Sequence, residues 1–97
     1  MEMAATSILF VDDEEVIRKS LARELRIKHF TVTTVAGGQE AIEALQSGQY
    51  DLVITDLMMP EVDGFGVLKA VKRFAPQTSV IILTGYGDMR TAIDALR

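Results

Sequence analysis

The chain of 97 residues contains no cysteine, no long apolar run and no extended basic cluster. Without cysteine there is no disulfide framework, thiolate zinc site or cysteine nucleophile, so any metal must be held mainly by oxygen. No apolar run approaches the ~20 residues that span a bilayer. Residues 1–6 also lack the basic and apolar segments of a signal peptide. We therefore expect a soluble, cytoplasmic protein that makes no membrane contact.

Charge and length narrow the possible functions further. Ten basic and fourteen acidic residues give a net charge of −4, and no Lys/Arg cluster is longer than a pair. This balance gives little support for binding a phosphate backbone, so we expect no direct nucleic-acid partner. The length suits one compact domain. We expect a tail over residues 1–6 and a single domain over residues 7–97.

Short apolar runs alternate with amphipathic segments along the chain. The expected strands are residues 7–11, 30–35, 52–55 and 79–83, and the expected helices are residues 14–28, a segment ending near Gly48, a segment ended by Pro76, and a segment beginning at Asp88. Strict alternation of apolar strands and helices predicts a parallel sheet with helices on both faces and right-handed crossovers. The expected fold class is therefore a doubly wound α/β domain.

Polar residues follow three of these strands. Asp12 and Asp13 follow the first, Asp56 follows the third and Thr84 follows the fourth. In such sheets ligands bind beyond the carboxyl ends of the strands, where strand order reverses. If strands one and three are neighbours, the carboxylates meet, and two unit charges about 4 Å apart repel by about 4 kcal/mol at an effective dielectric near 20.

This acidic cluster calls for a cation or a proton. With only oxygen ligands available, the natural cation is Mg²⁺, and without it the carboxylate pKa values should be raised. A carboxylate beside Mg²⁺ can also attack a phosphoryl donor in line and form an acyl phosphate. The Thr84 hydroxyl could then donate a hydrogen bond to a phosphoryl oxygen and draw its loop inward.

The chain resembles the receiver domain of two-component response regulators. The matching features are the Asp12-Asp13 pair after SILFV, Ala36, Gly38, Glu40 and Ala41 in A-x-G-x-E-A, DLMMP at Asp56 to Pro60, Asp63-Gly64, and IILTG at Ile81 to Gly85. The resemblance implies a flavodoxin-like sheet with strand order 2-1-3-4-5. It also implies a signalling module, not an enzyme.

The resemblance implies a role for each site residue. Asp56 would accept a phosphoryl group from a histidine kinase or phosphotransfer protein, and the module would then switch conformation. Asp13 and Asp56 would ligate Mg²⁺ directly, Asp12 would help through water, and Met58 would contribute its backbone carbonyl. Thr84 would be the phosphate-sensing hydroxyl.

The sequence departs from the family pattern at its C-terminal end. The family continues into a fifth strand, ending in a lysine that pairs with phosphoryl oxygens, and a fifth helix, whereas this sequence ends at Arg97. We therefore expect order 2-1-3-4 without the fifth βα unit, in a C-terminally incomplete domain. An exposed strand-four edge would favour a homo-oligomer or swapped dimer, or the chain is a fragment of a longer protein.

Two other functions stay open. One is a receiver-like binding module that is not phosphorylated because the lysine is missing. The other is a Mg²⁺-dependent phosphohydrolase, which is weakened because Met58, two residues after Asp56, offers no acid/base group. Among the remaining residues we expect His29 to be a solvated loop residue, the Met58 and Met59 side chains to pack in their loop, and Gly37 and Gly38 to be turn residues.

Overall fold

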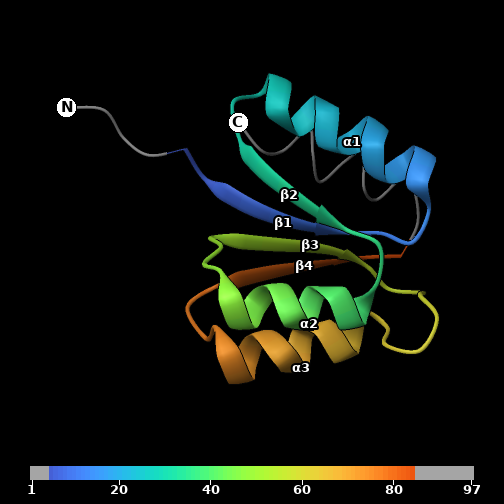
Figure 1. Cartoon of the computed structure of the whole chain (residues 1–97), viewed down its shortest axis with the longest axis vertical. Helices are drawn as coiled ribbons and strands as arrows, with labels where there is room; N and C mark the ends of the chain where they lie inside the picture. Colours follow the sequence, from blue (N-terminus) through green and yellow to red (C-terminus); the bar gives the residue numbers. More distant parts are fainter. Residues whose placement is uncertain (1–4, 85–97) are drawn as a thin grey trace.

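A parallel sheet in the order β2-β1-β3-β4 forms the centre of the computed structural model, which describes residues 5–84 (Figure 1). The strands are β1 (Ser7–Val11), β2 (Thr31–Val35), β3 (Leu52–Asp56) and β4 (Ser79–Leu83), and the helices are α1 (Glu15–Ile27), α2 (Gly38–Ser47) and α3 (Gly64–Phe74). The predicted flavodoxin-like, doubly wound fold with order 2-1-3-4 is thus confirmed.

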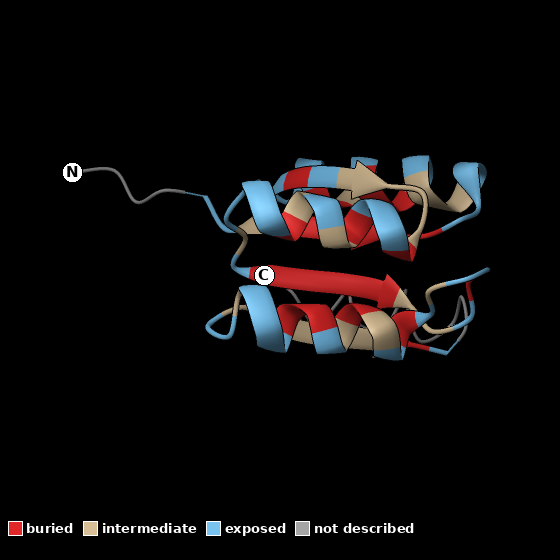
Figure 2. Cartoon of the chain, turned by 60° about the horizontal axis from the view of Figure 1, so that its bottom comes forward, coloured by how far each residue is buried: buried red, intermediate tan, exposed pale blue. Residues whose placement is uncertain are grey.

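The sheet is the middle of three layers, with α1 on one face and α2 beside α3 on the other (Figure 1). Figure 2 shows a central strand that is buried along nearly its whole length. In β1, Ile8 and Phe10 pack into the core under α1, while Leu9 and Val11 pack into the core under α2 and α3. All four side chains are 0% exposed. Because successive side chains point to opposite faces, a strand covered on both sides needs a continuous apolar run.

The third helix begins at a side-chain cap. Asp63 precedes α3 and accepts a hydrogen bond from the Gly66 N–H at 3.0 Å, which satisfies one of the free donors of the first turn. Leu68 and Val71 are apolar residues at helical spacing in this segment. Val71 is buried, whereas Leu68 is only half-buried.

Gly38 is a correction to the sequence analysis. It is buried and is the first residue of α2, so the prediction of a turn residue was wrong. A Cβ built on Gly38 would lie 2.6 Å from the Cγ1 atom of Val62. The Val62 carbonyl oxygen is closer still, so this position needs glycine to make room for both the backbone and the side chain of Val62. Gly37 is the N-cap of α2, with an extended φ of −163° and open space around it.

Strand β4 lies at one edge of the described sheet, where it pairs with β3. Its middle residues Val80, Ile81 and Ile82 are only half-buried. The helix predicted from Asp88 lies outside the described residues. Among helices within residues 5–84, none is both long and apolar enough to cross a membrane.

Candidate functional site

The sheet brings three carboxylates together at the carboxyl ends of its two central strands. Asp12 and Asp13 follow β1, and Asp56 is the last residue of β3. The register pairs Val11 of β1 with Thr55 of β3, and the residue that follows each of them in the chain is an aspartate, Asp12 or Asp56. One carboxylate oxygen from each of these acids lies within 4.8 Å of the others. The convergence expected from the sequence is therefore present.

Burial and mutual repulsion raise the pKa of two of these acids. For Asp12, which is 1% exposed, desolvation is the largest cause of the raised pKa, and the charges of Asp56 and Asp13 add to it. For Asp56 desolvation also comes first, followed on the raising side by the charge of Asp13. These directions match the expectation for an acidic pocket without a cation.

Backbone hydrogen bonds hold the first acid in place. The Oδ1 atom of Asp12 accepts from the Glu14 N–H at 2.8 Å, at the start of α1. Its carbonyl oxygen accepts from Nη1 of Arg18, one turn along the same helix, at 2.9 Å. The Asp12 carboxylate is therefore fixed by the junction between β1 and α1, while Asp13 is exposed to solvent.

The loop after β3, residues 57–63, holds the third acid. The backbone N–H groups of Leu57 and Met58 oppose the rise in the pKa of Asp56. The Leu57 N–H donates to the Leu83 carbonyl of β4 at 2.8 Å, and the Leu57 carbonyl accepts from the Gly64 N–H at 2.9 Å. The neighbouring strand and α3 thus fix the backbone beside Asp56.

Gly64 allows this close packing. A Cβ built on it would lie 2.8 Å from the Asp56 carbonyl oxygen and 3.0 Å from the Leu57 Cα. These are backbone atoms, so they could not rotate away as the end of a flexible side chain could. The glycine is needed because the start of α3 touches the peptide that carries Asp56.

The remaining predicted site residues lie around the acids. Asp56 pairs with Leu83 across the sheet, so Thr84 comes one residue beyond that pair at the exposed end of β4. The two methionines differ: Met59 is buried in the core under α2 and α3, whereas the Met58 side chain is 73% exposed. Loop packing was thus correct for Met59 and wrong for Met58.

The residues present fit a hard divalent cation. Carboxylate oxygens are the ligands that Mg²⁺ prefers, and the half-buried and exposed positions of Asp56 and Asp13 leave room for retained waters. A cation would also relieve the repulsion that raises the two pKa values. Asp12, Asp13 and Asp56 are therefore the residues of the described chain that could hold it.

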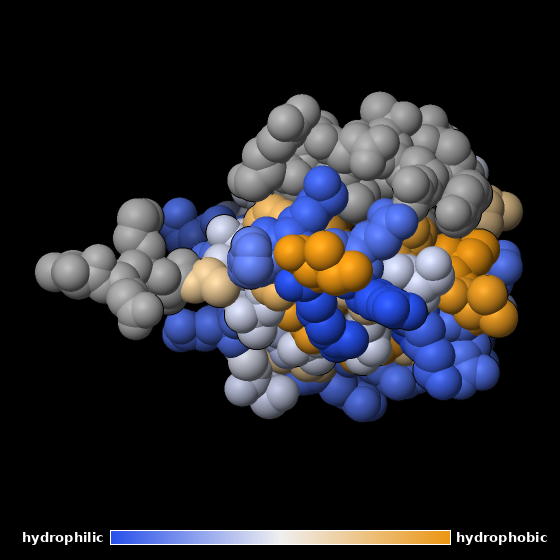
Figure 3. Space-filling view, turned by 90° about the horizontal axis from the view of Figure 1, so that it is seen from above, coloured by the Kyte–Doolittle hydropathy of each residue, from blue (hydrophilic) through white to orange (hydrophobic). Residues whose placement is uncertain are grey.

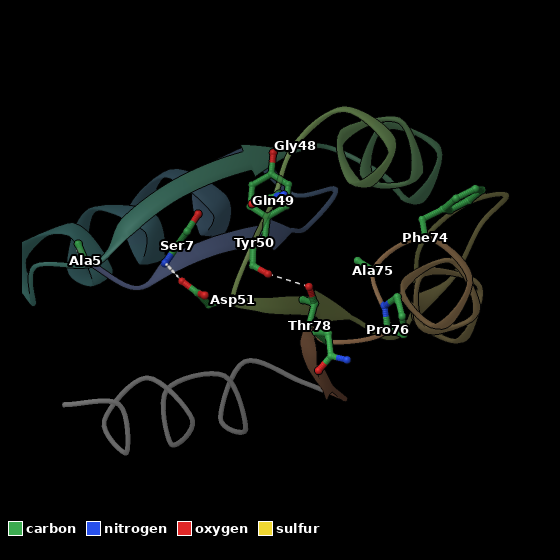
Figure 4. Close-up of a pocket in the computed structure, with 11 residues that line it drawn as sticks. Ala5, Ser7, Gly48, Gln49, Tyr50, Asp51, Phe74, Ala75, Pro76 and Thr78 are labelled. Carbon is green, nitrogen blue, oxygen red and sulfur yellow. Dashed lines mark hydrogen bonds between the residues drawn. The ribbon is translucent and has the colours of Figure 1, made fainter. Parts of the chain in front are cut away.

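The hollow shown in Figure 4 lies at the opposite ends of the strands and does not contain the acids. It encloses about 570 Å³ and is lined by residues such as Ser7, Asp51 and Thr78, which stand at or before the starts of β1, β3 and β4. Its carboxylate, Asp51, accepts from the Ser7 N–H at 2.8 Å. This hollow is therefore separate from the acidic cluster.

Sequence reasoning missed two residues near the site. Glu61 has a φ of 65°, and Val62 lies against both Gly38 and Gly66. No pattern in the sequence predicts the contact of Val62 with α2. The only signal in the sequence is the glycine pair Gly37-Gly38, which the sequence analysis assigns to a turn.

Solved structures with the same fold include receiver domains with magnesium. The chain is similar to the response regulator TrrA from Thermotoga maritima in complex with Mg(2+)-BeF, at 37% identity and a TM-score of 0.78 over 89% of this chain and 75% of that one. It is also similar to the receiver domain of the sensor histidine kinase PA1611 from Pseudomonas aeruginosa PAO1, with a magnesium ion in its active site cleft. That match has 28% identity and a TM-score of 0.77 over 84% and 68% of the two chains.

Curated relatives are longer regulatory proteins. The chain is 32% identical over 94 residues to the C4-dicarboxylate transport transcriptional regulatory protein DctD of Rhizobium meliloti, covering 97% of this chain and 20% of the relative. It is 40% identical over 85 residues to the DNA-binding transcriptional regulator NtrC of Escherichia coli, covering 88% and 18%. The chain spans about one fifth of these relatives.

A family model matches most of the chain. The model described as the response regulator receiver domain matches residues 8–97, a range that includes all three aspartates and Thr84. This chain belongs to the response regulator receiver domain family.

Proposed function

We propose that this chain is a phosphoacceptor module in which Asp56 takes a phosphoryl group from a phosphohistidine, with Mg²⁺ held by Asp12, Asp13 and Asp56. The observation that carries this proposal is the convergence of three carboxylates within 4.8 Å at the ends of β1 and β3. Thr84, at the end of the adjacent strand β4, supports it. The transfer and the subsequent change of conformation carry the signal.

Each residue has a defined part in the transfer. A carboxylate oxygen of Asp56 attacks phosphorus, an acyl phosphate forms, the P–N bond breaks, and the bonding electrons leave with the donor imidazole, which takes up a proton. Bound Mg²⁺ would neutralise charge on the phosphoryl oxygens. The Met58 carbonyl is proposed as a further ligand. The Thr84 hydroxyl donates to a phosphoryl oxygen and draws the end of β4 toward Asp56.

A small phosphodonor tests this proposal directly. Incubation with acetyl phosphate and Mg²⁺ should add one phosphoryl group to the chain, detected by intact mass. The addition should disappear with Asp56→Asn and with a chelator. Asp51→Asn is the matched control, because Asp51 is an exposed carboxylate that lines the hollow at the opposite ends of the strands. Labelling that persists in Asp56→Asn would overturn the assignment of the acceptor.

The labelling assay separates the binding module, and a turnover assay on phosphomonoesters separates the phosphohydrolase. A chain that binds Mg²⁺ and stays unlabelled would be a binding module and not a phosphoacceptor. A phosphohydrolase would turn over phosphomonoesters. We do not favour it, because the residue two positions after Asp56 is Met58, whose thioether cannot transfer a proton.

A protein partner fits the surroundings of the site. Hydrophobic side chains reach the surface on the α1 side of the molecule (Figure 3), and Val16 at the start of α1 is 81% exposed. Phe65, in the first turn of α3, is 57% exposed. Apolar side chains beside a polar centre suit a protein–protein contact. We propose that the partner is a histidine kinase or phosphotransfer protein in the cytoplasm.

We propose residues 7–97 as the receiver unit and residues 1–6 as a tail preceding it. Nucleic acid is not part of the proposal, since the net charge of the chain is −4. Self-association through the edge of β4 stays a prediction. Sedimentation analysis at high protein concentration tests it, and a stable monomer there would contradict it.

A further inference from the structure

The Val62 side chain lies in a notch between two glycines from different helices. A Cβ built on Gly38, the first residue of α2, would lie 2.6 Å from Val62 Cγ1. A Cβ built on Gly66, in the first turn of α3, would lie 2.7 Å from the same methyl group. Real Cβ atoms do not approach so closely, so either alanine would displace Val62. The Val62 carbonyl oxygen is the nearest atom to the Cβ built on Gly38, so α2 makes room for the backbone and the side chain of Val62, and α3 makes room for its side chain.

Val62 also closes a strained turn. Its N–H donates to the Pro60 carbonyl at 2.8 Å, and the residue between them, Glu61, has a φ of 65°. A hydrogen bond from residue i+2 to residue i around a positive φ defines the rare, strained form of the γ-turn. Such a backbone persists only where its surroundings hold it in place. The surroundings of this turn are the notch at Val62 and the buried side chain of Met59.

This turn belongs to the loop that holds the phosphoacceptor. At the start of the loop, beside Asp56, the Leu57 N–H donates to the Leu83 carbonyl at 2.8 Å and the Leu57 carbonyl accepts from the Gly64 N–H at 2.9 Å. The loop ends at Asp63, which caps α3. The side chains that anchor it between these ends are Met59 and Val62, both packed in the core under α2 and α3. A shift of Val62 would therefore move the backbone that contacts the acceptor carboxylate.

We infer that Val62 is a positioning residue for phosphoryl transfer. Clamped between Gly38 and Gly66, it holds the loop in the form in which the Gly64 N–H bonds the Leu57 carbonyl beside Asp56. The start of α2, which contributes none of the three acids, thereby becomes a structural part of the site. This inference rests on the proposed phosphoacceptor function.

The test is a double-mutant cycle on Val62 and Gly66, with a matched control. Val62→Ala removes both γ-methyl groups, including the Cγ1 that lies against the two glycines. Val32→Ala, the control, makes the same change in the buried core on the other face of the sheet. The rate of phosphorylation by acetyl phosphate at saturating Mg²⁺ should fall at least tenfold for Val62→Ala and stay within about twofold for Val32→Ala, since small misplacements of reacting groups slow reactions strongly.

Gly66→Ala supplies the second arm, because the methyl group of Val62 is the only close neighbour of the added Cβ. The single variant should also slow phosphorylation. Adding Val62→Ala should not slow Gly66→Ala further, because both changes disturb the same contact. Gly37→Ala, which meets open space, should leave the rate unchanged. Independent, additive losses, or equal losses in Val62→Ala and Val32→Ala, would overturn the inference.

Hydrogen exchange of the Gly64 amide, which donates to the Leu57 carbonyl, separates this inference from the proposed function. Protection should be lost in Val62→Ala and kept in Val32→Ala, whether or not the wild-type chain accepts a phosphoryl group. An unlabelled wild-type chain would overturn the phosphoacceptor function and, with it, the catalytic consequence of Val62. Unchanged Gly64 protection in Val62→Ala would overturn the positioning role alone.

Discussion

The Asp12 and Asp56 carboxylates lower the stability of the folded state at neutral pH. Both have a pKa raised above the usual 3.8, mainly by desolvation. The folded state therefore binds protons more tightly than the unfolded state does. Stability falls as pH rises from about 3.8 through the raised pKa values, and the full cost is present at neutral pH.

Removing one charge should therefore stabilise the chain without metal. In chelator at pH 7, Asp56→Asn should raise the free energy of unfolding by up to about 1 kcal/mol, a modest gain because water screens a half-buried carboxylate. Denaturant titrations should show the gain shrinking as the pH is lowered toward 4. Asp51→Asn, which lies outside the acidic cluster, is the matched control. A loss of stability in Asp56→Asn at pH 7 would contradict the repulsion described for the cluster.

His29 is confirmed as an exposed residue, and its backbone has a structural role. Its φ is 72°, a left-handed conformation that glycine adopts most easily. The His29 N–H donates to the Arg26 carbonyl, and the Phe30 N–H donates to the Leu25 carbonyl. This pair of hydrogen bonds is the Schellman motif that ends α1.

Glycine at this position should stabilise the protein. His29→Gly relieves the left-handed strain of about 1 kcal/mol, offset in part by the greater freedom of glycine in the unfolded chain. A net gain of about 0.5 kcal/mol is expected in the free energy of unfolding, measured by denaturant titration. Lys28→Gly is the control, since its φ of −81° gives glycine no advantage. A destabilised His29→Gly variant alongside an unaffected Lys28→Gly would contradict this account.

At the scale of elements, the connection from β3 to α3 fixes the site. Gly64→Ala places a methyl group against the Asp56 carbonyl and the Leu57 backbone. Overpacking of this kind costs about 1–3 kcal/mol. Thermal unfolding should show this loss for Gly64→Ala and little change for Gly37→Ala, whose neighbourhood is open. Equal effects of the two substitutions would show that Gly64 does not support the site.

The elements themselves followed from the sequence more completely than their contacts did. The apolar run SILFV gave β1 with its observed limits, because a strand buried on both faces must be apolar throughout. Asp12 and Asp56 followed from reading the ends of the strands. Neither the γ-turn at Glu61 nor the contact of Val62 with Gly38 could be predicted, because both depend on how distant segments pack.

At the scale of the whole molecule, a cation should act as a stabilising ligand. A ligand that binds only the folded state adds about 2.7 kcal/mol at a concentration one hundred times its Kd. Mg²⁺ should therefore raise the Tm of the wild-type chain relative to chelator. The rise should be reduced in Asp12→Asn and Asp13→Asn and retained in Asp51→Asn. An equal rise in all of these variants would mean that Mg²⁺ binds elsewhere.

The sheet order is the feature on which the site depends. Periodicity alone indicated a doubly wound fold, and the order 2-1-3-4 came from the family resemblance. With β1 and β3 adjacent, the acids at their ends must meet. The parallel pairing of β4 with β3 then places Thr84 one residue after Leu83, the partner of Asp56.

Fragment mass spectrometry of the acetyl phosphate-treated chain, with and without Mg²⁺, tests the central claim most directly. The account predicts a single Mg²⁺-dependent phosphoryl group located on Asp56. A phosphoryl group on any other residue, or on Asp56 at the same rate in chelator, would contradict it.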